Sequence, residues 1–105
     1  MINLYVTEPG VLRRAPAGSP IDETVVWVDM VDPSMEELHR VDQALGVDIP
    51  TKEEMREIEA SSRLYEEDGA LYMTATVLSS VETGSPVASA ITFVLTHGRL
   101  ITVRH

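Results

Sequence analysis

VVWVDMVDPSMEELHRVDQALGVDIPTKEEMREIEASSR, residues 25–63, is the stretch that decides the fold of this chain. Its first four residues are all apolar, which predicts a strand that is buried on both faces. Asp32 and Pro33 then predict that a helix starts at residue 33, because Asp is favoured at the N-cap and Pro at the first helical position. The rest of the chain must pack on this strand and on the helices that follow it.

The first helix is expected to extend to residue 45. Apolar side chains recur along it at helical spacing and form one stripe that faces a core: Met35, Leu38, Val41 and Leu45. Gly46 stands where a left-handed C-terminal cap would end this helix. Thr51 and Glu54 then have the spacing of a capping box, which predicts a second helix over residues 52–60, and Pro50 is expected to pack on Met55 as a hydrophobic staple.

The remaining segments predict strands before and after the two helices. Apolar or alternating runs occur at residues 2–6, 11–14, 63–66, 71–78, 90–95 and 100–103. Two hairpin turns are expected, at Asp68-Gly69 and at His97-Gly98. Together these elements predict an α/β fold, a mixed β-sheet of about six to seven strands packed with helices that cover at least one face.

The strand at residues 71–78 has two different faces, because successive side chains of a strand point to opposite sides. One face carries Leu71, Met73, Ala75 and Val77, and the other carries Tyr72, Thr74, Thr76 and Leu78.

Length and composition limit the possible classes of protein. The 105 residues are enough for one domain with a modest core. The chain has no cysteine, which excludes disulfides and thiolate metal sites. No segment approaches the ~20 consecutive apolar residues that cross a bilayer, and no signal peptide is expected. Because His105 comes directly after the last expected strand, we expect the chain to be a domain cut from a longer protein.

The net charge of −9 is concentrated in one part of the chain. Residues 29–68 hold 13 of the 17 acidic side chains and only four of the eight basic ones. Such a surface repels the phosphates of nucleic acids and anionic membranes, so neither is expected to bind. It is compatible with cations, although a solvated helical face is the simpler interpretation.

The residues that usually carry catalysis are missing or scattered. The glycines occur singly, so there is no phosphate-binding loop. His39, His97 and His105 have no spacing typical of metal ligands, and no Ser-His-Asp set can be nominated. These observations argue against an enzyme.

Three acidic residues of the second helix are the candidate site. Glu53 and Glu57 lie four residues apart, where like charges repel by a few tenths of a kcal/mol. A hard divalent cation would relieve this repulsion, and so would water and salt. Glu54 borders the buried stripe formed by Met55 and Ile58. Its alternative role is structural, since the fourth residue of a capping box bonds back to the backbone N–H of Thr51.

Several of these segments together resemble a known family. They are Trp27-Val28-Asp29 with Asp32-Pro33, the helix end at Gly46-Val47, Thr51 to Glu54, Arg63-Leu64-Tyr65-Glu66, and the closing run Leu100-Ile101-Thr102-Val103-Arg104. Over residues 24–104 the pattern resembles the N-terminal cytoplasmic domain of the CorA-type divalent cation transporters.

This resemblance implies a mixed α/β/α domain at the cytoplasmic face of the inner membrane, in a homopentamer that imports Mg²⁺ and also Co²⁺ and Ni²⁺. A related branch of the family moves Zn²⁺. The family's stalk helix, membrane helices and Gly-Met-Asn pore tripeptide do not occur in this sequence. The 105 residues are therefore expected to sense ions or brace the assembly, and not to conduct ions or insert into the membrane. Without its stalk and membrane helices, the chain is expected to be a monomer or weak dimer.

The resemblance also implies a site. In the family, an acid near the second helix pairs with an acid on a neighbouring subunit's stalk to hold a regulatory cation, and this position falls on Glu54. We expect weak Mg²⁺ binding at Glu54, with Glu53 or Glu57 nearby. The alternative function is a stand-alone interaction domain whose acidic helices bind a protein partner and no metal.

Overall fold

The computed structural model describes residues 1–57, 63–79, 84 and 87–105. The elements follow one another as β1 (Ile2–Glu8), β2 (Val11–Arg14), β3 (Val25–Val31), α1 (Met35–Leu45), α2 (Lys52–Glu57), β4 (Arg63–Glu67), β5 (Ala70–Ser79), β6 (Val87–Thr96) and β7 (Arg99–Arg104). No helix among these residues is long and apolar enough to span a membrane.

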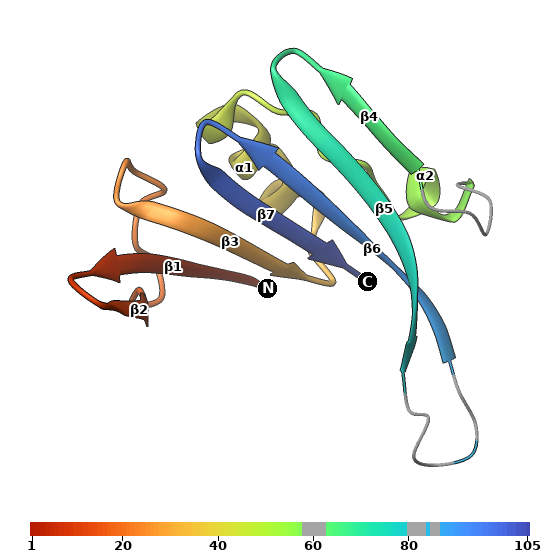
Figure 1. The fold of residues 1–105 in the computed structure, drawn as a ribbon, viewed down its shortest axis with the longest axis horizontal. Coiled ribbons are helices and arrows are strands. Elements are labelled where there is room, and N and C mark those ends of the chain that lie inside the picture. Colours follow the sequence, from red (N-terminus) through yellow and green to blue (C-terminus); the bar gives the residue numbers. More distant parts are fainter. Residues whose placement is uncertain (58–62, 80–83, 85–86) are drawn as a thin grey trace.

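All seven strands form one mixed sheet in the order β2-β1-β3-β7-β6-β5-β4 (Figure 1). The pair β3–β7 is parallel and every other neighbouring pair is antiparallel. The first strand pairs with β3, while the last strand joins β3 to the C-terminal hairpins. This arrangement confirms the predicted α/β class, the interior position of β3 and both predicted hairpin turns.

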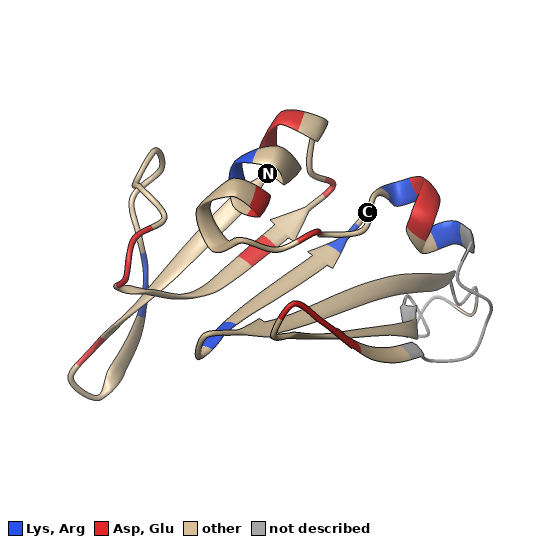
Figure 2. Cartoon of the chain, turned by 90° about the horizontal axis from the view of Figure 1, so that it is seen from above, with Lys and Arg blue, Asp and Glu red and all other residues tan. Residues whose placement is uncertain are grey.

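Both helices cover the same face of the sheet (Figures 1 and 2). The core lies between them and the sheet, and its members are Leu4, Val25, Val28, Met30, Leu38, Val41, Leu45, Val47, Ile49, Met55, Ala70, Tyr72, Val94, Ile101 and Val103. The described residues thus form two layers, and the opposite sheet face, which we call the open face, is covered by none of their helices.

The start of α1 differs from the sequence prediction. Ser34, and not Asp32, is the N-cap, and the helix begins at Met35. The Ser34 hydroxyl accepts the Glu37 backbone N–H at 3.1 Å, and the Glu37 carboxylate accepts the Ser34 N–H at 3.0 Å. This reciprocal pair satisfies two free N–H groups, whereas Asp at the N-cap would satisfy one. Asp32 instead takes a positive φ of 43° in the turn before the helix.

The apolar stripe of α1 is shorter than predicted. Leu38, Val41 and Leu45 are buried, but Met35 is 66% exposed because it stands in the first turn, at the rim of the core. The end of the helix is as predicted. Gly46 has a φ of 64°, and its N–H donates to the Asp42 carbonyl at 2.9 Å.

The expectation that residues 25–28 are buried on both faces is wrong for one face. Val25 and Val28 are fully buried under the helices, whereas Trp27 is half-buried on the open face. Trp27 stacks on Tyr5 with ring centroids 4.4 Å apart, and its indole N–H donates to the Thr102 hydroxyl at 2.9 Å.

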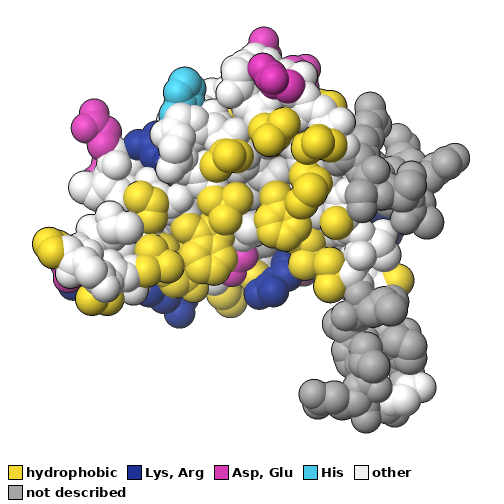
Figure 3. Space-filling model, in the orientation of Figure 1, with side chains coloured by type: hydrophobic (Ala, Val, Ile, Leu, Met, Phe, Trp, Pro, Cys, Tyr) yellow, Lys and Arg dark blue, Asp and Glu magenta, His cyan; other side chains and the backbone are white. Residues whose placement is uncertain are grey.

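The open face is the more apolar face of β5. Tyr72 and Thr74 point into the core, and the Thr74 hydroxyl bonds that of Thr92 at 2.8 Å. The large apolar side chains exposed on β4, β5 and β6 are Leu64, Leu71, Met73, Val77 and Leu95. Figure 3 shows hydrophobic side chains gathered across this face.

Candidate functional site

The candidate site is the start of α2, and its first turn is held by the predicted capping box. The Thr51 backbone N–H donates to the Glu54 carboxylate at 3.1 Å, and the Glu54 N–H donates to the Thr51 hydroxyl at 3.2 Å. Met55 is buried and fixes this helix on the core. Glu54 therefore has the capping role that was the alternative to metal binding.

The structure gives less information on the other two candidate acids, Glu53 and Glu57. Glu53 is exposed. Glu57 is the last residue of α2, but its side chain is not among those described, and Ile58 lies outside the described residues. The predicted pairing of Glu53 with Glu57 is therefore not tested, and the staple between Pro50 and Met55 stays a prediction, although both residues are buried.

Asp42, which the sequence did not single out, is affected in the fold by the charges of two other acids, Asp48 and Glu54. Asp42, near the end of α1, accepts the Ile49 backbone N–H at 2.9 Å. Burial raises the pKa of Asp42 above its usual value, and the charges of Asp48 and Glu54 raise this pKa further, against the lowering effect of the Ile49 hydrogen bond. Asp42 of α1 is thus influenced by Glu54 of α2 and by Asp48 of the segment between the helices.

Tyr72 holds the segment between the helices against the sheet. Its hydroxyl accepts the Asp48 backbone N–H at 3.1 Å, and its ring stacks on Tyr65 with centroids 4.9 Å apart. Burial raises the pKa of the Tyr72 phenol, so this hydroxyl stays neutral over the physiological range. A side chain of the sheet thereby positions the backbone beside the three carboxylates.

The site is not a complete metal centre within the part of the chain that the structure describes. None of its His, Asp and Glu residues form a group of three that could hold a metal ion. Two cations, Lys52 and Arg56, also share the helix with the acids. The arrangement can offer carboxylate oxygens to a cation, but the remaining oxygen ligands would have to come from water or another chain.

The raised pKa of Asp42 makes a testable prediction. The folded state holds this proton more tightly than the unfolded state, so the free energy of unfolding falls as pH rises from about 3.8 through the raised folded pKa. Asp42→Asn keeps an oxygen for the Ile49 N–H and removes the charge. Chemical denaturation from pH 3.5 to 7 should therefore show the variant gaining stability relative to the native chain as pH rises. A difference that stays constant with pH would contradict the assignment.

The chain is similar in sequence to known magnesium transport proteins. No protein-family model matches the chain. A magnesium transport protein CorA from Pasteurella multocida is 29% identical over 105 residues, which are 99% of this chain and 33% of that protein. The CorA of Escherichia coli K12 is 34% identical over 79 residues, covering 75% of this chain and 25% of the relative. The aligned segments lie in the N-terminal part of these proteins.

A solved structure has a fold similar to that of this chain. The CorA magnesium transporter of Methanocaldococcus jannaschii matches with a TM-score of 0.65 at 15% identity, over 98% of this chain and 32% of that one. The chain thus spans about a third or less of the length of the proteins that it matches.

Proposed function

Because this chain corresponds to the N-terminal part of the CorA-type transport proteins, we propose that it is the regulatory domain of a CorA-like magnesium transporter. The observation that carries the proposal is an alignment that extends over nearly the whole chain, supported by the similar fold of a solved CorA structure. The relatives are transport proteins, and the domain's proposed role is to sense Mg²⁺ for a pore formed elsewhere in the parent protein. An equivalent domain of a zinc-transporting relative is the closest variant of this proposal.

The proposed parent is a homopentamer in the inner membrane, with this domain on the cytoplasmic side. The stalk and membrane helices of the parent would supply most of its subunit contacts and its ion path. Mg²⁺ would therefore be both the transported ion and, at higher cytoplasmic concentration, the signal that the domain detects.

Glu54 is the proposed metal ligand, with Glu53 or Glu57 beside it on α2. Its carboxylate is fixed by the cap, and Asp42 lies close enough for the two carboxylates to affect each other, which favours a cation there. Mg²⁺ needs about six oxygen ligands and gives up its water reluctantly. One or two carboxylates of this domain should consequently bind it only weakly, in the millimolar range, until an acid of a neighbouring subunit completes the site.

This proposal predicts different effects for two variants. Glu54→Gln keeps the capping geometry, because Gln can replace Glu in a capping box, but it removes the charge. Thr51→Ala weakens the cap by about 1 kcal/mol and keeps the charge. In an NMR titration with Mg²⁺, amides of residues 51–57 should shift in the native chain and in Thr51→Ala, and much less in Glu54→Gln.

In the full-length parent, Glu54→Gln should make transport less sensitive to inhibition by internal Mg²⁺. Unchanged inhibition, or equal effects of the two variants, would leave Glu54 with its capping role alone.

The alternative is an interaction domain that binds a protein partner, and the exposed apolar open face favours it. The sequence of the parent gene after residue 105 discriminates the two. Two further apolar segments of ~20 residues each would support the transporter. A gene that lacks them would support the interaction domain.

A further inference from the structure

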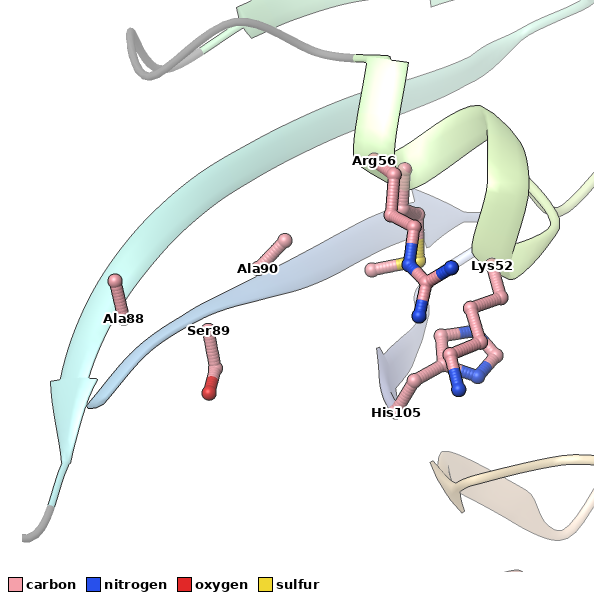
Figure 4. Close-up of a pocket in the computed structure, with 7 residues that line it drawn as sticks. Lys52, Arg56, Ala88, Ser89, Ala90 and His105 are labelled. Carbon is pink, nitrogen blue, oxygen red and sulfur yellow. The ribbon is translucent and has the colours of Figure 1, made fainter.

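A basic pocket of about 330 Å³ lies between α2 and the first part of β6. Its lining consists of Lys52, Met55, Arg56, residues 88–90 and His105. In Figure 4 the side chains of Lys52, Arg56 and His105 lie together at one end of the pocket, while Ala88 and Ser89 lie at the other. Among the described acids, neither Glu53 nor Glu54 lines this pocket.

The two cations of α2 are placed to act together. Lys52 and Arg56 are four residues apart, so they share one side of the helix, and their like charges repel. Within the described part of the chain, neither side chain has a carboxylate partner within ion-pair distance. Two positive charges without a carboxylate partner among the described residues thus lie together at one end of the pocket. An anion between the two head groups would relieve the repulsion.

His105 supplies an independent sign of a missing partner. Its side chain is only 9% exposed, and its Nδ1 lies 3.7 Å from the Asp32 carboxylate. The other ring nitrogen, Nε2, is buried and has no hydrogen-bond partner among the described residues. Buried side-chain nitrogens are normally paired, so an unpaired one beside a cavity points to a ligand atom. An imidazole nitrogen that carries a ring proton can donate it to an oxyanion.

We propose that this pocket binds the phosphate group of a small metabolite or inorganic phosphate. A planar guanidinium, an ammonium group and an imidazole N–H are three donors suited to a tetrahedral oxyanion with several acceptor oxygens. The pocket also has apolar walls at Met55, Ala88 and Ala90, which can hold the body of a phosphomonoester.

Inorganic phosphate is the first probe, followed by NMR at constant ionic strength, with adenosine monophosphate as the second. Saturable amide shifts are expected at residues 52–56, 88–90 and 105. Arg56→Ala should raise the Kd at least about fivefold, as one charge-assisted hydrogen bond is lost. His105→Phe, which keeps the ring volume, should also weaken binding. Arg13→Ala is the matched control, because it removes one exposed charge from β2, at the other end of the sheet, and should leave the Kd unchanged.

The two sources of phosphate are distinguished by their affinities. Tighter binding of the nucleotide supports a phosphomonoester, and equal binding supports free phosphate. The proposal is overturned if acetate binds as well as phosphate, if Arg13→Ala weakens binding as much as Arg56→Ala, or if no saturable shifts occur. None of these measurements depends on transport or on Mg²⁺.

Discussion

Replacing Tyr72 with alanine is expected to lower the free energy of unfolding by about 3–5 kcal/mol, the range typical of large aromatic side chains removed from a core. Tyr72 is only 2% exposed, and its ring stacks on Tyr65. Its hydroxyl also holds the Asp48 backbone N–H. The variant therefore loses a filled volume and leaves a backbone donor without its partner. Urea denaturation followed by far-UV circular dichroism measures this loss.

Tyr72→Phe separates the two contributions. The ring and its stacking remain, and only the bond to Asp48 is lost, so the cost should fall to about 1–2 kcal/mol. The same variant should shift the amide signals of residues 46–51, because the sheet no longer fixes this segment. Equal stabilities of Tyr72→Phe and the native chain, with unmoved amides, would show that the hydrogen bond does not position the candidate site.

Trp27→Ala is expected to cost about 2–3 kcal/mol, less than the 3–5 kcal/mol of a fully buried Trp, because this side chain is half-buried. The variant loses the stack on Tyr5 and the indole bond to Thr102. The Thr102 hydroxyl still donates to Asp29 at 2.8 Å, so the polar chain beside the strand survives in part. Thermal and chemical denaturation of the variant measure the effect.

Trp27→Phe is the control for this experiment. It keeps an aromatic ring against Tyr5 and loses only the indole N–H, so its cost should be near 1 kcal/mol. A Trp27→Ala variant with native stability would contradict the interior placement of β3, since a side chain between β1 and β7 cannot be removed without loss of packing.

The resemblance recognised in the sequence is confirmed by the relatives and by the fold. It rested on short segments, and local chemistry decides the conformation of several of them, such as the helix end at Gly46 and the capping box of Thr51 and Glu54. Each is determined by residues within a few positions of it. Where two local signals competed, as at the start of α1, the stronger reciprocal cap of Ser34 prevailed over Asp32.

The candidate site could be predicted only in part. Glu54 and its capping partner are adjacent in sequence, and the structure places them as the capping box requires. Asp48 and Glu54 act on Asp42 only because Gly46 ends α1 and Tyr72 holds the segment that follows. The basic pocket is likewise assembled from segments far apart, since α2 meets β6 and His105 there.

The sequence by itself determined the order and nature of the elements and where most helix ends and turns fall, because these depend on neighbouring residues. Only the tertiary structure decided which face of each strand is buried. In β5 both faces can enter a core, and the alternation of side chains defines two faces without ranking them. The helices settle the choice. They pack on the side of Tyr72 and Thr74, which leaves Leu71 and Met73 on the open face. The position of the helices on the sheet depends in turn on long-range strand pairing, such as the parallel pairing of Trp27 with Leu100. No local signal in the sequence connects these two residues.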